Sequence, residues 1–384
     1  MTRTISILGA TGSIGASTLD LIRREAGKLR VVALTANGNA ADLARLAREF
    51  SAEVAVVADE ANLPALRDML AGTGIAAAGG AAALVEAASR PADITVAAIV
   101  GCAGLAPCMA AIEQGRTVAL ANKEALVSAG DVMLAAVARH GSTLLPVDSE
   151  HNAIFQCLAG NDPVHVRSIT LTASGGPFRD WSTEQLASAT PEQAVCHPNW
   201  QMGAKISVDS ATMFNKGLEL IEAHHLFPVG LGKLRIVVHP QSVVHSMVEY
   251  RDGSTLAQLG PSDMRVPIAS CLAWPERMDT PCAPLDLAAL GELTFRAPDE
   301  VRFPATRICR DAAQAGGAAA AVLNAANEVA VASFLDGKIG FTRIAAMVEE
   351  VMARYAPAIP AALGDVFAID EEARRHARAL LEFA

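Results

Sequence analysis

The feature that most constrains the fold is a regular alternation of apolar runs and helix-like stretches over the first 150 residues. The apolar runs lie at 4–10, 30–36, 53–59, 94–101, 117–122 and 143–148. Alanine- and leucine-rich stretches separate them, for example Ser13–Ala26, Ala40–Phe50 and Ala125–His140. Apolar strands joined by helices are typical of βαβ units. The pattern therefore predicts a Rossmann-like, doubly wound parallel sheet that binds ligands at the carboxyl ends of its strands.

The pattern changes after residue 150. Runs at 235–240, 242–250 and 254–260 read as adjacent strands, with a hairpin turn at 251–253. The chain is irregular and proline-rich after Pro275, and helical from about Thr306. We predict an α/β protein in four parts: an NADP-binding Rossmann-like domain (1–149), a central α+β catalytic domain (150–275), a linker (276–305) and a C-terminal α-helical domain (306–384).

Composition narrows the function classes. Hydrophobic residues make up 52% of the 384 residues, enough for two or three domain cores. No run approaches the roughly 20 apolar residues of a membrane span, and we expect no secretory signal. The seven cysteines form no CxxC pair, which fits reduced thiols in a cytoplasmic protein. The net charge of −10 disfavours nucleic acid or a membrane as partner, but allows a small anionic ligand in a local cationic pocket.

The stretch Gly9–Gly15, GATGSIG, lies between the first expected strand and the first expected helix. Glycines let the backbone approach a pyrophosphate, and the helix start supplies N–H groups. The spacing is GxxGxxG, which an ordinary tight turn could also show. Within a series of βαβ units we favour a dinucleotide site, with the phosphates nearest Thr11, Gly12, Ser13 and Ile14.

The tip after the second strand indicates which dinucleotide binds. It reads Asn37-Gly38-Asn39, with no carboxylate before Asp42. NAD sites usually place an acid there for the ribose 2′-hydroxyl, so its absence favours NADP. No arginine or lysine is present for a 2′-phosphate, so the preference would depend on hydrogen bonds.

The stretch Leu144–Phe155, LLPVDSEHNAIF, places Asp148 and Glu150 at the end of the last parallel strand. In an extended chain these two side chains would face the same crevice. They would repel each other unless a cation or a proton lay between them. Capping of a helix that starts near His151 would explain one of these polar residues, but not three in a row.

Residues 207–224 read as one helix with Asp209 or Ser210 near its cap. Its buried stripe would be Phe214, Leu218 and Ile221, and its polar face Thr212, Asn215, Lys216, Glu219 and Glu222. A solvated face with an ion pair between Lys216 and Glu219 would be the ordinary explanation. The same face also suits a phosphate and a metal. Asp148, Glu150 and Glu219 would then form an oxygen site for Mg²⁺ or Mn²⁺ rather than zinc.

Three more segments would complete a pocket. TASGGPF (172–178) suggests an anion nest around Ser174, and Asn122, Lys123 and Glu124 follow another strand. The loop 196–205 exposes Trp200 and Met202 and would act as a lid, unless Trp200 packs on the core instead. We leave His151, His239 and His245 out of the metal set, because histidines beside a site more often pack than ligate.

In this order, GATGSIG, ALANKEALV, VDSEHNAIFQ, SGGPFR, HPNWQMG, KISVDSATM, NKGLE and HPQSVVHSMV resemble the 1-deoxy-D-xylulose 5-phosphate reductoisomerase family. The resemblance runs through LNAANEVAVASFL, nearly the whole chain. It implies an NADPH- and metal-dependent enzyme that isomerises and reduces this sugar phosphate to 2-C-methyl-D-erythritol 4-phosphate in isoprenoid precursor synthesis. It also implies Mg²⁺ or Mn²⁺, with Co²⁺ as a further candidate, and a homodimer paired through the central sheet.

The resemblance assigns a role to individual residues. The metal ligands fall on Asp148, Glu150 and Glu219. The substrate contacts fall on Lys123, Ser149, Glu150, Ser174, His197, Ser210, Asn215, Lys216 and Glu219. The cofactor contacts fall on Thr11, Gly12, Ser13, Ile14, Asn37, Asn39, Asn122, Glu124 and Gly203. The expected catalytic residues are Lys123, Glu150 and His197. Family members often carry a basic residue where this chain has Asn37-Gly38-Asn39, so the strength of NADPH preference stays open.

Two rival interpretations also stay open from the sequence. A semialdehyde or homoserine-type dehydrogenase begins with a similar glycine turn, but it would need a catalytic cysteine or would lack the metal carboxylates. A non-catalytic NADP-binding sensor would bind the cofactor without turnover, and it leaves the three carboxylates without a purpose.

Overall fold

The computed structural model describes residues 2–25, 27–200 and 202–381. The expected helix end at Ala26 and Gln201 of the lid loop lie outside this part of the chain. The internal contacts divide the chain into two compact units. The first comprises Met1–Ala125, Met133–Asn152 and Asp263–Cys282, and the second comprises Leu126–Val132, Ala153–Ser262 and Ala283–Ala384. The four-part domain division stays a prediction.

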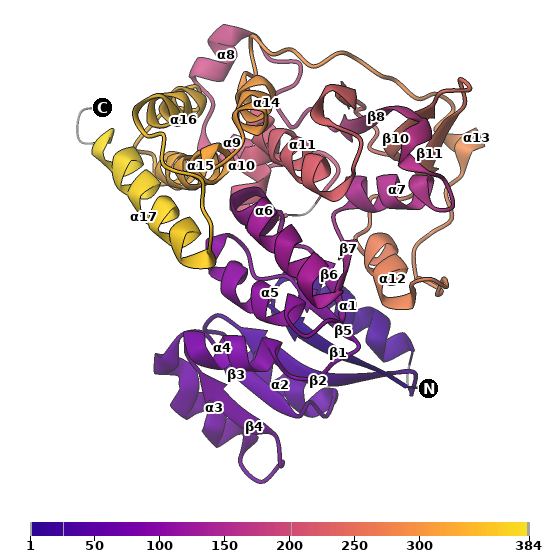
Figure 1. Ribbon diagram of the computed structural model, residues 1–384, viewed down its shortest axis with the longest axis vertical. Coiled ribbons are helices and arrows are strands. Elements are labelled where there is room, and N and C mark those ends of the chain that lie inside the picture. The colour runs from indigo at the N-terminus through magenta and orange to yellow at the C-terminus, as the bar shows by residue number, and fades with distance from the viewer. Residues whose placement is uncertain (1, 26, 201, 382–384) are drawn as a thin grey trace. The chain divides into compact units, whose positions relative to one another are not determined.

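The first unit is built on a parallel sheet of seven strands (Figure 1). These are β1 (Arg3–Leu8), β2 (Leu29–Ala36), β3 (Val54–Val57), β4 (Ala76–Gly79), β5 (Ile94–Ala97), β6 (Thr117–Leu120) and β7 (Thr143–Pro146). Their order is β4-β3-β2-β1-β5-β6-β7, which confirms the doubly wound sheet. The strand order reverses between β1 and β5, the place where such sheets bind ligands.

The helices of the first unit follow its strands, as βαβ units require. They are α1 (Ser13–Arg24), α2 (Ala40–Glu49), α3 (Leu63–Leu70), α4 (Ala81–Ala88) and α5 (Leu105–Ile112), followed by α6 (Lys123–His140), which both units share. Helix α2 packs on α3, and α4 packs on α5. Helix α12 (Arg265–Ala273) returns to this unit late in the chain and packs on α1, β6 and β7.

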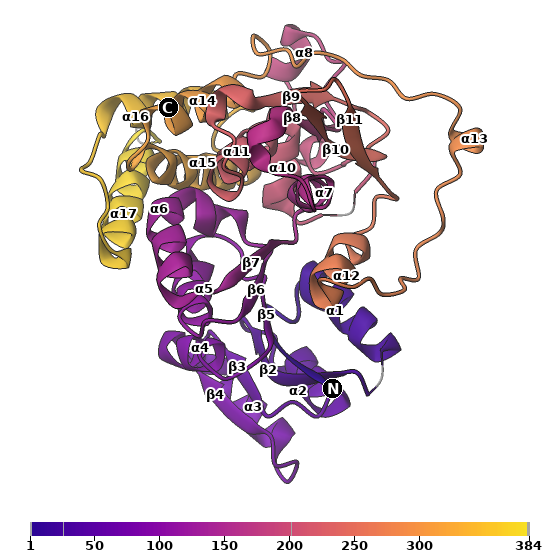
Figure 2. The same cartoon turned by 45° about the vertical axis from the view of Figure 1, so that its right-hand side comes forward.

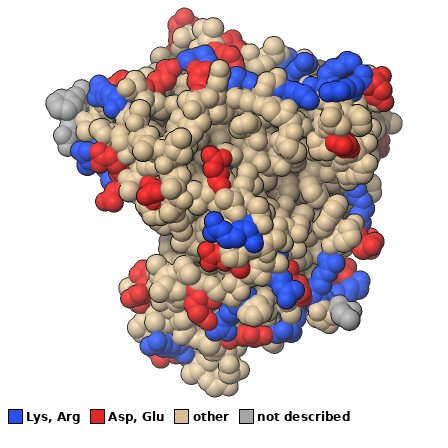
Figure 3. Space-filling model, in the orientation of Figure 1, with Lys and Arg blue, Asp and Glu red and all other residues tan. Residues whose placement is uncertain are grey.

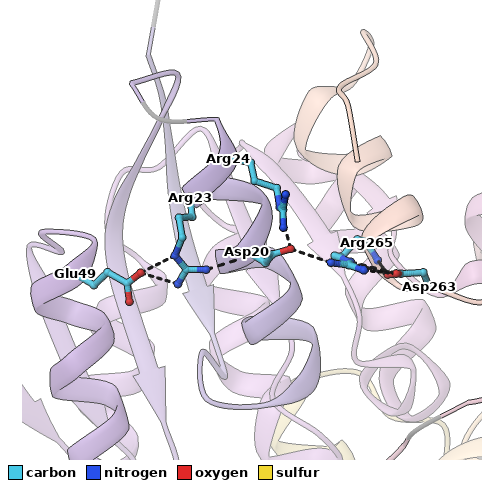
Figure 4. Close-up of polar contacts among 6 residues, drawn as sticks. All are labelled: Asp20, Arg23, Arg24, Glu49, Asp263 and Arg265. Carbon is cyan, nitrogen blue, oxygen red and sulfur yellow. Dashed lines mark hydrogen bonds and ion pairs between the residues drawn. The ribbon is translucent and has the colours of Figure 1, made fainter. Parts of the chain in front are cut away.

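An ion network links the start of α12 to α1 and α2 (Figure 4). Arg265 Nη1 lies 3.1 Å from the Asp20 carboxylate on α1, and Arg265 also pairs with Asp263. Arg23, one turn along α1, reaches Glu49 on α2 at 2.6 Å. These ion pairs therefore join α1 and α2, which are close in the sequence, to α12, which is distant from both.

The second unit contains a mixed sheet of four strands in the order β11-β10-β8-β9. These are β8 (Val166–Ala173), β9 (Leu234–Val238), β10 (Val244–Tyr250) and β11 (Thr255–Leu259). The hairpin between β10 and β11 is confirmed. The expected adjacency of the strands near 235–240 and 242–250 is wrong, because β8 pairs with both β9 and β10. Residues 239–243 form a loop rather than a tight hairpin turn, so β9 and β10 can separate.

Helices make up the rest of the second unit (Figures 1 and 2). They are α7 (Ser149–Leu158, which starts in the first unit), α8 (Thr183–Ala187), α9 (Pro191–Ala194), α10 (Ala204–Thr212), α11 (Phe214–Leu226), α13 (Leu287–Leu290), α14 (Ala305–Ala315), α15 (Ala319–Leu335), α16 (Arg343–Arg354) and α17 (Leu363–Ala379). Helix α15 packs against α10, α14, α16 and α17. Their shared core includes Phe178, Phe214 and Phe334. The predicted helical C-terminal region is therefore present.

The single helix expected over residues 207–224 is wrong, because Met213 breaks it. Met213 has a φ of +67°, a left-handed conformation that a right-handed helix cannot contain. Helix α10 ends before it and α11 begins after it, so Asp209 and Ser210 lie inside α10 rather than at a cap. The buried stripe is confirmed, because Phe214 and its two apolar partners on α11 are buried.

Two surface features bear on partner classes. On the face shown in Figure 3, acidic and basic side chains are interspersed, and broad areas carry neither. Among the described residues, no helix has both the length and the apolar character that a membrane crossing needs.

We expect Arg265→Gln to lower the free energy of unfolding of the first unit by about 2 kcal/mol, because it removes charged hydrogen bonds that are only partly exposed. Burial raises the pKa of Asp20, but Arg24 and Arg265 outweigh burial and lower that pKa. This stabilisation should therefore be present at neutral pH and fade as acid protonates Asp20. Urea unfolding at neutral and acidic pH measures both effects. Arg354→Gln, on an exposed pair, is the control and should change stability little.

Candidate functional site

The glycine turn joins β1 to α1 beside the point where strand order reverses. Gly9 has a φ of +93°, and a Cβ there would lie 2.7 Å from the carbonyl oxygen of Ala98, just after β5. A Cβ on Gly15 would lie 2.4 Å from the carbonyl oxygen of Gly9. A Cβ on Gly12 would meet only that oxygen, at 3.5 Å. Gly9 and Gly15 are therefore needed for the turn itself, whereas Gly12 leaves open space at the start of α1.

The start of α1 suits an anionic group. No side chain caps this helix, and its first turn contains no acidic residue. Its first N–H groups therefore face no capping side chain, and the helix dipole favours a negative charge there. The residues predicted nearest the phosphates, Thr11, Gly12, Ser13 and Ile14, are all exposed or half-buried. This end of the helix fits a dinucleotide phosphate.

Two predicted cofactor residues also have structural roles in the first unit. The Asn39 side chain accepts from the N–H of Asp42 at 3.1 Å and caps α2. The Asn122 side chain accepts from the N–H of Ala125 at 3.1 Å and caps α6, while its Nδ2 donates to the Gly101 carbonyl at 2.9 Å. Of the remaining predicted contacts, Asn37 is exposed after β2, Glu124 is buried in the first turn of α6, and Gly203 is exposed at the start of α10.

The first unit brings Lys123, Asp148, Ser149 and Glu150 together. The Lys123 ammonium pairs with the Asp148 carboxylate, and their side chains are only 7% and 12% exposed. The Ser149 hydroxyl donates to the Glu150 carboxylate. Burial alone would raise the pKa of Asp148, but Lys123 and then His151 outweigh it and hold that pKa well below its usual range. Asp148 is therefore negatively charged at neutral pH.

The backbone around these carboxylates differs from the extended geometry expected. Strand β7 ends at Pro146, and Glu150 already lies in the first turn of α7. Asp148 Oδ1 accepts from the Glu150 N–H at 3.4 Å, which is the capping contact that the sequence offered as an alternative. The polar residues follow the strand directly, as predicted, but a helix start rather than strand alternation orients their side chains.

In the second unit, Glu219 accepts from two neighbours on α11. Asn215 Nδ2 lies 2.6 Å from its carboxylate, and Lys216 forms an ion pair with it. Lys216 and Glu219 are 3% and 1% exposed, and Glu222 is 1% exposed. This polar face is therefore buried rather than solvated. A carboxylate so far from water needs a cationic partner, and Lys216 provides one.

His197 is held in one neutral form by its neighbours in the lid loop. Its Nδ1 accepts from the N–H groups of Asn199 at 3.1 Å and Trp200 at 3.0 Å. Its Nε2 must then carry the proton, which it donates to the Ser174 hydroxyl at 2.9 Å. Burial, and secondly the nearby Arg179, lowers the pKa of His197 to about 4. The structure thus joins the predicted lid residue to the predicted anion nest.

The glycine pair after β8 brings that nest to α10. The N–H of Gly176 donates to the Ser174 hydroxyl at 3.1 Å. A Cβ on Gly176 would lie 2.6 Å from the carbonyl oxygen of Ser210, so the two backbones are in close contact. Ser174 and Ser210, both predicted substrate contacts, therefore lie on touching segments.

Two anchoring residues were not predicted from the sequence. Asn199 Nδ2 donates to the Pro240 carbonyl at 2.7 Å and lies 2.9 Å from the Ser242 hydroxyl, which fixes the predicted lid loop to the turn after β9. Asp209, expected only as a cap, is buried and accepts from Asn327 at 2.8 Å, which fixes α10 to α15. The only local signal for Asn199 was its place between a proline and a tryptophan.

Among the histidines left out of the metal set, His239 has a clear structural role. Its Nδ1 lies 2.9 Å from the Thr294 carbonyl, and its Nε2 accepts from the Val243 N–H at 3.2 Å. His151 is fully buried, with Nδ1 3.8 Å from the Asp148 carboxylate.

The donor set fits a hard divalent cation. Asp148, Glu150 and Glu219 offer carboxylate oxygens, the ligands that Mg²⁺ and Mn²⁺ prefer. Asp148 and Glu219 each already face a lysine ammonium, so both positions attract positive charge. Asp148 and Glu150 belong to the first unit and Glu219 to the second, so their joint site stays a prediction.

Models of one protein family match most of the chain. The 1-deoxy-D-xylulose 5-phosphate reductoisomerase model matches residues 5–130, and its C-terminal domain model matches residues 144–227. A model described as the DXP reductoisomerase C-terminal domain matches residues 259–376.

Individual proteins give the same result. The 1-deoxy-D-xylulose 5-phosphate reductoisomerase of Zymomonas mobilis is 60% identical over 99% of this chain and 98% of its own length. That of Rhodospirillum centenum is 58% identical over 98% of this chain and 93% of its own. A Zymomonas mobilis enzyme solved with NADPH has a TM-score of 0.95 at 58% identity, with both chains fully covered. A DOX-P reductoisomerase solved with NADPH, fosmidomycin and magnesium has a TM-score of 0.94 at 44% identity, over 99% of this chain and 98% of that chain.

We expect Gly15→Ala to destabilise the first unit by about 2 kcal/mol, because its Cβ would collide with backbone oxygens that cannot move freely. Gly12→Ala is the matched control and should unfold like the wild type, because its Cβ meets only an ordinary contact. Thermal unfolding of both variants measures the difference. Equal stability of the two variants would contradict the separate roles of these glycines.

We expect His197 to titrate near pH 4 and to be neutral, with the proton on Nε2, at pH 7. The unfolded chain takes up this proton near pH 6.5, so the histidine should cost stability as pH falls from about 6.5 to about 4. Nitrogen-15 NMR of labelled histidines measures both the pKa and the tautomer. In Ser174→Ala the pKa should stay low, because burial is its main cause; a normal pKa in the wild type would refute the prediction.

Proposed function

The chain belongs to the 1-deoxy-D-xylulose 5-phosphate reductoisomerase family, and from this premise we propose the family's reaction for it. The chain converts 1-deoxy-D-xylulose 5-phosphate to 2-C-methyl-D-erythritol 4-phosphate, a step in the non-mevalonate synthesis of isoprenoid precursors. It uses NADPH and a divalent metal, Mg²⁺ or Mn²⁺. The observation that carries the proposal is 60% identity to such an enzyme over 99% of the chain.

Asp148, Glu150 and Glu219 are the proposed metal ligands. When bound, a divalent ion acts as a Lewis acid toward the ketone and hydroxyl oxygens of the substrate. The lowered pKa of Asp148 keeps this carboxylate ionised at neutral pH. Lys123, already paired with Asp148, is the proposed charge stabiliser or proton relay beside the reacting oxygens. Ser149 orients Glu150 through its hydroxyl and is a further substrate contact.

The substrate phosphate is proposed to bind Ser174, Ser210, Asn215 and Lys216. The close approach of the Ser174 loop to α10 supports this grouping. Asn215 and Lys216 supply an amide and an ammonium on one turn of α11. Both donate to Glu219, so they are oriented before the substrate arrives, which lowers the cost of ordering them on binding.

His197 is the proposed lid residue that closes over the substrate. It is neutral at physiological pH, so it contributes hydrogen bonds rather than a positive charge. Its present partner, Ser174, is itself a proposed substrate contact. Asn199 anchors the same loop, which would keep His197 above the nest while water is excluded.

NADPH is proposed to bind the first unit with its phosphates at the start of α1, near Thr11 to Ile14. Asn37, Asn39, Asn122, Glu124 and Gly203 are the other proposed contacts. The cofactor carries the hydride, and the protein positions its ring and excludes water. The exposed Asn37-Gly38-Asn39 tip contains no cation, so hydrogen bonds would determine the preference for NADPH over NADH.

The assembly is proposed to be a cytoplasmic homodimer paired through the second sheet. Strand β11 is an edge strand, and its residues Thr255, Leu256 and Ala257 are exposed, so its backbone can pair with another copy. The net charge of −10 supports a small-molecule substrate rather than nucleic acid or a membrane surface as the main partner.

The test is NADPH oxidation, followed by absorbance, with 1-deoxy-D-xylulose 5-phosphate as substrate. Chelation of divalent metal should abolish turnover, and added Mg²⁺ or Mn²⁺ should restore it. Glu150→Gln should reduce turnover at least about a thousandfold, because a neutral amide is a poor metal ligand, while NADPH binding survives. Gly12→Ala should do the reverse and weaken NADPH binding without changing metal dependence.

Two results would contradict the proposal. Turnover that survives chelation would exclude the metal-dependent reaction. Wild-type turnover by the Glu150→Gln variant would show that Glu150 is not a metal ligand, even though the chain belongs to the family.

A further inference from the structure

A cavity in the second unit contains none of the proposed substrate or metal residues. Its volume is about 250 Å³. It is open to solvent and is lined by the loop after β8, the end of β9, the break between α10 and α11, and the connection that leads into α14. Arg179, Arg296 and Arg302 line it, together with Asp180 and Asp299. Three guanidinium groups and two carboxylates thus give the cavity an excess of positive charge.

The arginines have hydrogen-bond donors to spare. Each guanidinium carries five N–H donors. Within the described chain, Arg179 uses one for Asp180 and one for the Ser174 carbonyl, and Arg296 uses one for Asp180. Arg302 similarly uses one for Asp299 and one for a backbone carbonyl. Most N–H groups on the three side chains can therefore donate to an additional ligand.

Asp180 does not neutralise its arginine partners firmly. Asp180 is shared between Arg179 and Arg296, and the Asp180 and Arg296 side chains are each 61% exposed. Ion pairs this exposed contribute about 0–1 kcal/mol, so an anion that binds two arginines at once can compete with them. Guanidinium groups bind phosphate through paired hydrogen bonds, which a single carboxylate shared between two arginines cannot match.

We propose that this cavity binds a small phosphate-bearing anion through Arg296, Arg179 and Arg302. The ligand class is inorganic phosphate or a phosphate monoester. A monoester would also place carbon atoms against Met213, Val238 and Phe303, which line the same cavity.

Occupancy of the cavity would be communicated to the loop that carries Ser174. Arg179 Nη1 donates to the Ser174 carbonyl at 3.3 Å, and Gly175, the next residue, lines the cavity. An anion that fixes Arg179 therefore also restrains this loop. Binding of the anion would make this loop more ordered and would not change the chemical step of the proposed reaction.

The test is isothermal titration calorimetry of the full chain with inorganic phosphate, and separately with glycerol phosphate, at low ionic strength. Arg296→Gln should weaken binding to the cavity about tenfold, because one charged contact is lost. Asp180→Asn should strengthen it, because a competing carboxylate is removed. Tighter binding of glycerol phosphate than of phosphate would identify a monoester as the preferred ligand, and the reverse order inorganic phosphate.

The controls separate this cavity from the proposed substrate site and from general charge effects. Arg307→Gln and Asp311→Asn alter an exposed pair on α14 outside the cavity, with side chains 46% and 61% exposed, and should leave binding unchanged. Ser210→Ala, in the proposed substrate site, should leave the cavity's binding intact. The proposal is overturned if Arg296→Gln and Asp180→Asn bind like the wild type, or if the α14 controls change binding equally. It is also overturned if Ser210→Ala abolishes all binding, because phosphate then reaches only the substrate site.

Discussion

Buried pairing of lysine with carboxylate is the interaction on which the polar interior of this protein depends. Lys123 pairs with Asp148 in the first unit, and Lys216 pairs with Glu219 in the second. A buried charge without a partner costs several kcal/mol, so neither member of a pair can be lost alone without penalty. Lys123 is the first residue of α6 and Lys216 lies within α11, so a helix fixes the position of each lysine. The fold therefore holds reactive groups in place before any ligand binds.

The parallel sheet could be predicted because continuous apolar runs carry a strong signal. Six of its strands occur within a few residues of their expected positions. The strand missed, β4, has the sequence AAAG, whose small residues lack the β-branched and aromatic side chains that mark strands. The glycine turn was equally clear, because Gly9 and Gly15 satisfy steric needs that only glycine meets.

Contacts between distant segments were harder to predict. The break at Met213 has no glycine or proline to announce it. The insertion of β8 between β9 and β10 depends on strand pairing, which local sequence does not encode. Periodicity identified the polar face of α11 but left both a solvated face and a binding face open, since only the folded chain reveals what covers it. For the same reason the buried ion pairs within each unit were predicted only in part, and the anchoring residues Asn199 and Asp209 were missed.

The first unit is assembled from three separate lengths of chain, and the last of them is residues 263–282. During synthesis, the sheet and α1 leave the ribosome long before α12, whose Arg265 meets Asp20 on α1. Nearly three quarters of the chain must therefore be synthesised before the last helix of the first unit can dock. No single cut in the gene can release this unit whole, so the first unit cannot be isolated by simple truncation.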